Sequence, residues 1–202
     1  MKETISVRIL GPSLAIRFGG FACYAYVIRN KEGHLLHEAC GLAENPVNQL
    51  SSATSSVAIY TALVRGLEWL IQNGYKNDII IVKTSSKSLI SQLDGIYQSP
   101  QTPENKKENN LPKSIVPLHA KALGLKSRFY KLSFELLARN RNVSNGATTD
   151  IDDETKEIEE LLVLAYVEAE EKIMKQVRIL SEQKSPFVTA AQLMKYKKTQ
   201  AS

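Results

Sequence analysis

The residue types that most often carry out chemistry in proteins are few in this chain, and their spacing does not group them. Its three histidines, His34, His37 and His119, have no convergent pattern of cysteines or carboxylates around them. No glycine-rich phosphate loop and no nucleophile elbow is present. The two cysteines, Cys23 and Cys40, lie in stretches typical of strands and are expected to pack as small apolar residues. These patterns indicate neither a metal centre nor a nucleophilic hydrolase site.

Charge is distributed unevenly along the sequence. The net charge is +5, yet residues 150–171 contain ten acidic residues and one basic residue. The rest of the chain is therefore strongly basic, which is compatible with a polyanionic partner. The alternative is a solvated acidic helix beside an ordinary basic surface, and the sequence leaves both interpretations open.

Composition favours a globular protein of the cell interior. Apolar residues make up 43% of the 202 positions, enough to bury a core without disulfides or metals. No apolar run approaches the roughly 20 residues that span a bilayer, and the N-terminal MKETISVRIL lacks the pattern of a signal peptide. We expect a soluble protein of the cytoplasm or another reducing compartment, with no membrane partner.

Periodicity predicts alternating strands and helices. Strands are expected over residues 5–11, 21–29, 34–42, 78–83 and 132–138, and helices over 54–73, 86–93, 115–130 and 154–180. Proline-rich and polar stretches predict insertions at 98–114 and 140–153. We therefore expect one domain over residues 1–180 and a basic tail over 181–202.

Several of these segments resemble the ribonuclease H family, in the order in which that family has them. TSSVAIYTALVRGL at 54–67 is similar to the family's T-S-N-x-A-E-Y-x-A-L-x-x-G-L helix. VKTSSKSLISQLDGIY at 82–97 is similar to V-x-x-D-S-x-L-V-I-x-Q-x-x-G-x-Y, and residues 19–28, 117–129 and 137–139 match three further motifs. The resemblance implies an α/β fold with a five-stranded mixed sheet (three antiparallel strands, then two parallel), flanking helices and a long C-terminal helix.

The resemblance also implies where catalytic carboxylates would stand. Active members hydrolyse the RNA strand of an RNA–DNA hybrid with two Mg²⁺ ions, which require several acidic ligands. The four ligand positions fall on Leu10, Ile59, Ser85 and, more loosely, Glu159. We therefore expect no catalytic residues, no metal and no cofactor, and we expect Leu10 and Ile59 to pack as an apolar plug.

Nucleic-acid binding does not require those carboxylates. The resemblance places Thr54, Ser55 and Ser56 where relatives touch the minor groove of a hybrid, although helix capping explains them equally well. Basic candidates for phosphate contacts lie beside the second ligand position and in the two loops, where solvated lysines are the alternative. These basic residues are Lys83, Lys87, Lys106, Lys107, Lys113, Arg139 and Arg141.

Three functions follow as hypotheses. The first is a catalytically inactive module that binds RNA, an RNA–DNA hybrid or a ribonucleoprotein. The second is a structural subunit that contacts a protein partner through the helix at 154–180 and the basic tail. The third is an active hybrid ribonuclease with an atypical Mg²⁺ site built from Asp94, Glu159 and Glu160.

Overall fold

The structure, a computed structural model, describes residues 2–14, 21–44, 46–47, 53–94, 111–137 and 153–182. Its strands are β1 (Thr4–Leu10), β2 (Ser13–Leu14), β3 (Phe21–Arg29), β4 (Leu35–Ala43), β5 (Ile79–Thr84) and β6 (Lys131–Leu136). Its helices are α1 (Ser55–Gln72), the 3-10 turn η1 (Tyr75–Asn77), α2 (Lys87–Leu93), α3 (Val116–Lys126) and α4 (Asp153–Glu182). The predicted insertions and tail lie largely outside the described residues, so the domain boundaries stay predictions.

The strands form one mixed sheet. β3 lies between β4 and β1 and is antiparallel to both, whereas β5 is parallel to β1 and β6 is parallel to β5. The predicted α/β class, with three antiparallel strands followed by two parallel ones, is confirmed. The sequence missed β2, which pairs for two residues with the start of β3, because so short a strand has no alternation to detect.

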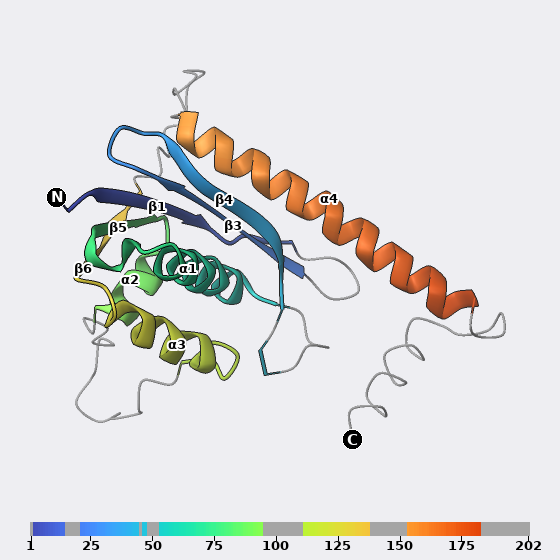
Figure 1. The fold of residues 1–202 in the computed structure, drawn as a ribbon. Coiled ribbons are helices and arrows are strands. Elements are labelled where there is room, and N and C mark those ends of the chain that lie inside the picture. The colour runs from blue at the N-terminus through green and yellow to red at the C-terminus, as the bar shows by residue number, and fades with distance from the viewer. Residues whose placement is uncertain are drawn as a thin grey trace, which may run out of the picture.

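Helices cover the two faces of the sheet unequally. In Figure 1, α1, α2 and α3 lie on one side, and α4 runs along β3 and β4 on the other. Ile5, Val7 and Ile9 of β1 are fully buried in the core on the α1 side. Cys23, Ala25 and Val27 of β3 belong to the smaller core beneath α4. The alternation of strand side chains thus separates the two cores.

The helix α1 is the centre of the larger core. Thr54 precedes it as the N-cap, and its Oγ1 accepts a hydrogen bond from the backbone N–H of Val57 at 3.3 Å. At the other end, Gly74 takes φ +90°, and its N–H donates to the carbonyl oxygen of Ile71 at 3.3 Å. A glycine suits that left-handed position because it has no Cβ. The predicted helix bounds of 54–73 are correct to within one residue at each end.

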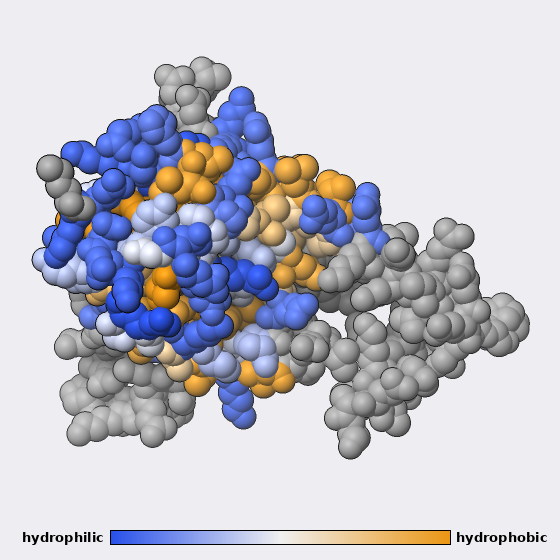
Figure 2. All heavy atoms as spheres, in the orientation of Figure 1, coloured by the Kyte–Doolittle hydropathy of each residue, from blue (hydrophilic) through white to orange (hydrophobic). Residues whose placement is uncertain are grey.

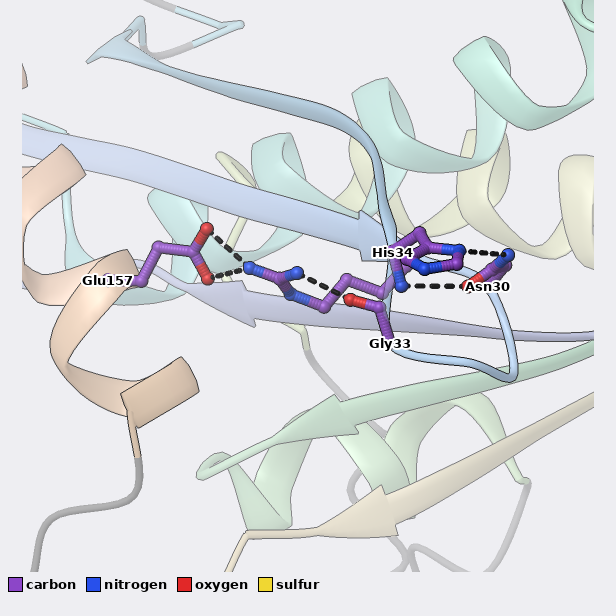
Figure 3. Close-up of polar contacts among 5 residues, drawn as sticks. Asn30, Gly33, His34 and Glu157 are labelled. Carbon is purple, nitrogen blue, oxygen red and sulfur yellow. Dashed lines mark hydrogen bonds and ion pairs between the residues drawn. The ribbon is translucent and has the colours of Figure 1, made fainter.

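Among the described residues, an apolar stripe and an ion pair hold the long helix α4 to the sheet. Ile158, Leu162, Ala165 and Ala169 recur every three or four residues and are buried against β3 and β4. The guanidinium of Arg29 on β3 binds both Glu157 of α4 and Gly33 of the β3–β4 turn, the two residues labelled at the ends of its dashed lines in Figure 3. One of its nitrogens donates to both carboxylate oxygens of Glu157 at 2.5 Å, and the other donates to the carbonyl oxygen of Gly33 at 2.6 Å.

The observed α4 extends one residue before and two residues after the predicted range of 154–180. Within the described ranges, no helix combines the length and the apolar character that a bilayer-spanning segment needs.

Candidate functional site

A cleft of about 1210 Å³ opens where β1 and β5 end. These two strands are neighbours and parallel, so their carboxyl ends meet at one edge of the sheet. In α/β folds such an edge is a frequent place for ligands. The first turns of α1 and α2, the end of β6 and the side of α4 complete the wall. Residues far apart in the sequence therefore face a common space.

All four ligand positions implied by the resemblance line this cleft. Leu10 lies at the end of β1, Ser85 directly follows β5, Ile59 is in the second turn of α1, and Glu159 is on α4. The structure thus brings together three non-acidic side chains and one carboxylate. Glu159 was the loosest assignment in the sequence, and its place in the wall depends on how α4 crosses the sheet.

A glycine allows α1 to approach the end of β1. A Cβ built on Gly11 would stand 2.3 Å from the backbone nitrogen of Ile59 and 2.7 Å from the carbonyl carbon of Ala58. Side chains at that distance from a backbone are not tolerated, so only glycine fits without a shift of the helix. Gly11 therefore allows α1 to lie directly against the chain at the end of β1, where Leu10 and Ile59 both line the cleft.

The two apolar residues line the cleft. Ile59 is 8% exposed and belongs to the core on the α1 side, whereas the half-buried Leu10 packs against the core beneath α4. The expectation that Leu10 and Ile59 pack as an apolar plug stays a prediction, and both residues line the cleft.

Hydroxyl groups make up much of the remaining wall. Ser55 and Ser56 at the start of α1, and Ser85, Ser86 and Ser88 around the start of α2, all line the cleft. The Oγ of Ser86 accepts from the N–H of Leu89 at 3.2 Å, so this hydroxyl is committed to capping α2. Thr54 likewise caps α1 and is not among the lining residues. Ser55 and Ser56 are exposed and face the cleft.

The seven basic candidates lie in different parts of the chain. Lys87 is exposed and lines the cleft. Lys83 lies outside the lining, next to Arg8 and Glu135 in the register of β1 and β6. Lys113 is exposed in the turn before α3. The other four predicted basic residues fall outside the described residues; they are Lys106, Lys107, Arg139 and Arg141.

The side chains of the cleft do not fit a pair of Mg²⁺ ions. Two dications close together need several carboxylates to offset their mutual repulsion, and the four positions supply one. Within the described residues, no group of three or more His, Cys, Asp or Glu side chains has the arrangement of a metal site. Asp94 forms an ion pair with the Nζ of Lys126 at 3.0 Å, and neither Asp94 nor Glu160 is among the lining residues.

Buried titratable groups near the cores have the properties of packing residues. Burial raises the pKa of the Cys23 thiol to about 11, and burial also raises the pKa of Cys40. Thiols protonated at neutral pH are poor nucleophiles and poor metal ligands. The buried phenol of Tyr60, whose pKa is likewise raised by burial, donates to Oε1 of Gln92 at 2.8 Å. This hydrogen bond ties α1 to α2.

Several cleft residues were not predicted from the sequence. Pro12, Leu136, Leu137 and Leu162 line the cleft, and none of them has a residue type that signals chemistry. Leu137 is positioned by its backbone N–H, which donates to the carbonyl oxygen of Thr84 at 2.8 Å and extends the pairing of β6 with β5. Strand register could have located it, because the ends of β5 and β6 are adjacent.

The strand order and the cleft between α1 and α4 define a ribonuclease-H-like α/β protein. Residues 20–147, more than half of the chain, match the protein-family model described as "Reverse transcriptase-like". The chain therefore belongs to this family. No curated protein matches its sequence significantly.

Solved structures agree with the fold. RNase H1 from the halophilic archaeon Halobacterium salinarum NRC-1 is 19% identical, with a TM-score of 0.50 over 67% of this chain and 86% of that one. LC11-RNase H1, isolated from compost by a metagenomic approach, is 22% identical, with a TM-score of 0.54 over 78% and 91%. The same LC11 protein in complex with an RNA/DNA hybrid is 25% identical over 69% and 88%, with a TM-score of 0.50.

Proposed function

We propose that this protein is a catalytically inactive member of its family that binds RNA or an RNA–DNA hybrid at the cleft. The observation that carries the proposal is the set of side chains at the four ligand positions. Leu10, Ile59 and Ser85 cannot replace carboxylates as ligands of paired Mg²⁺ ions, and Glu159 alone leaves most of the dication charge uncompensated. We therefore place no hydrolytic step at this cleft.

The side chains that line the cleft support the proposed binding. A hydroxyl-rich wall offers donors and acceptors for phosphates and 2′-hydroxyl groups, which dominate the recognition of A-form helices. Lys87 adds a positive charge to that wall. The structurally similar LC11-RNase H1 has been solved with an RNA/DNA hybrid, and the net charge of +5 favours a polyanion.

Fluorescence anisotropy with a labelled hybrid, duplex RNA and single-stranded RNA, over a series of salt concentrations, tests the binding. We expect Lys87→Ala to weaken binding several-fold and to lower the salt slope by about one. Lys31→Ala is the matched control, because Lys31 is an exposed lysine of the β3–β4 turn, at the opposite end of the sheet. Absence of binding at low salt, or equal effects of the two variants, contradicts the proposal.

Catalysis is tested separately by incubating the hybrid with Mg²⁺ or Mn²⁺ and following cleavage of the RNA strand. We expect no cleavage above the rate in the absence of protein. Metal-dependent cleavage that Glu159→Gln abolishes would establish the active alternative and would refute the inactivity.

A further inference from the structure

Basic residues gather at the edge of the sheet opposite to the cleft, where β1, β5 and β6 begin. The register of these parallel strands places their three starts side by side. The N-terminus marks this end of β1 in Figure 1, and Figure 2, drawn in the same orientation, shows mostly hydrophilic residues there. Five exposed residues of this edge are here called the amino-end patch: Lys2, Lys76, Arg128, Tyr130 and Lys131.

Short contacts hold the patch together around Tyr130. The Nζ of Lys2 lies 2.9 Å from the centre of the Tyr130 ring, a cation–π contact. The backbone N–H of Tyr130 donates to the carbonyl oxygen of Lys76 at 2.9 Å. The ring is nevertheless 62% exposed. An aromatic side chain is thus positioned among cations and remains open to a ligand.

The cations of the patch have no carboxylate partner within the described residues. On the neighbouring α3, Lys121 pairs with Glu68 at 2.7 Å and Lys126 pairs with Asp94 at 3.0 Å. Among the described parts of the chain, no such ion pair involves a basic residue of the patch. The positive charges of the patch are therefore available to an anion from outside the protein.

The amino-end edge is also more positive than the cleft. Segments 2–4, 75–78 and 128–131 contain four basic and two acidic residues, a net charge of +2. One of the two acidic residues, Asp78, uses its Oδ1 to accept a hydrogen bond from the backbone N–H of the other, Glu3, at 2.9 Å. The residues that line the cleft include one lysine and one glutamate, a net charge of zero.

We propose that the amino-end patch binds single-stranded nucleic acid. Its lysines and arginine would contact phosphates, and a base would stack on Tyr130. Proteins that hold single strands combine basic residues that follow the backbone with aromatic rings on which bases stack. A duplex offers the same phosphates, but its bases are stacked on one another and do not reach a side-chain ring. The exposed tyrosine therefore favours a single strand.

This site is separate from the cleft. The strand β1 has seven residues, so the two edges of the sheet are about 20 Å apart. The binding proposed for the cleft uses 2′-hydroxyl groups, which DNA lacks, whereas the patch requires only phosphates and a base. Single-stranded DNA thus reports on the patch, and either proposal can fail without the other.

Fluorescence anisotropy of the full chain with labelled oligo(dT) of about 15 nucleotides, over a series of salt concentrations, tests the proposal. We expect binding at low salt that Tyr130→Ala weakens about fivefold or more, the effect of losing one stacked base. Tyr130→Phe keeps the ring and should bind like the wild type. Lys131→Ala should lower the salt slope by about 0.7, the contribution of one phosphate contact.

Lys156→Ala is the matched control for Lys131→Ala. It removes the same charge from an exposed lysine of α4, which packs on β3 and β4 and not on the patch. We expect it to leave oligo(dT) binding unchanged, and circular dichroism verifies that each variant is folded. Absence of binding at low salt overturns the proposal, as do equal effects of the two lysine variants.

Two further outcomes also overturn it. If Tyr130→Ala binds like the wild type, the patch attracts polyanions by charge alone and holds no stacked base. If Lys87→Ala weakens oligo(dT) binding as much as Lys131→Ala does, the DNA lies in the cleft.

Discussion

Restoring the carboxylates tests whether the four cleft positions are the remains of a metal site. The perturbation is the triple change Leu10→Asp, Ile59→Glu and Ser85→Asp, which leaves Glu159 in place. Because all four residues line one cleft, the variant should hold four carboxylates that face one another. We expect it to be less stable than the wild type without Mg²⁺ and to regain stability when Mg²⁺ is added.

The expected loss of stability in the carboxylate variant follows from burial and charge. Ile59 is 8% exposed, so losing its apolar side chain costs about 2–3 kcal/mol. Repulsion between close carboxylates adds roughly 2–4 kcal/mol for each pair before screening by salt. Together these are a large part of a typical stability of about 5–15 kcal/mol. Mg²⁺ at tenfold its dissociation constant returns about 1.4 kcal/mol, or roughly 3–6 °C in melting temperature.

Thermal denaturation with and without Mg²⁺ measures this response. The matched control is the amide version, Leu10→Asn, Ile59→Gln and Ser85→Asn, which has similar shape without charge and should not respond to Mg²⁺. The wild type should not respond either. If the carboxylate variant folds but gains no more from Mg²⁺ than the amide variant does, the four positions do not converge on one metal site.

Three further predictions concern the parts that hold the cleft and the two cores together. Gly11→Ala should lower the free energy of unfolding, measured by urea denaturation, by about 2–4 kcal/mol, because its Cβ would meet the backbone of α1 at 2.3 Å. Gly124→Ala in α3 is the control, since a Cβ there has no neighbouring atom within 4 Å. It should raise the free energy of unfolding by up to about 1 kcal/mol. Glu157→Gln should lower the free energy of unfolding by about 0.5–1 kcal/mol, since the side chains of Arg29 and Glu157 are 21% and 28% exposed. A loss of stability that stays the same at high salt would contradict an ionic origin. Burial raises the pKa of Cys23 from 9.0 to about 11, so the folded protein keeps this proton while the unfolded chain loses it. Stability should therefore fall by about 2–3 kcal/mol as the pH rises from 9 to 11, and Cys23→Ala should flatten that slope in urea titrations.

Much of the fold could be predicted from local pattern. The alternation of apolar residues located β3 at its observed bounds, and the three-and-four spacing located α1 and α4 to within one or two residues. These signals are reliable because each element buries one face, and burial imposes its period on the sequence. β2 escaped prediction because two residues have no period.

The cleft required the tertiary structure. The sequence fixes that Leu10, Ile59 and Ser85 are not acidic, and no shift of register offers an acidic residue in 7–26 or 50–67. It does not fix whether these three side chains share one cleft. That depends on how closely α1 approaches β1 at Gly11, and on where α4 crosses the sheet to place Glu159 in the wall.

The sequence by itself determined which chemistry the side chains can perform, since ligand chemistry belongs to residue types. Only the tertiary structure decided which residues share a cleft and which face of α4 is left exposed. The reason is physical. Local periodicity indicates that one face of a helix or strand is buried, but which segment covers that face depends on contacts between residues far apart in the chain.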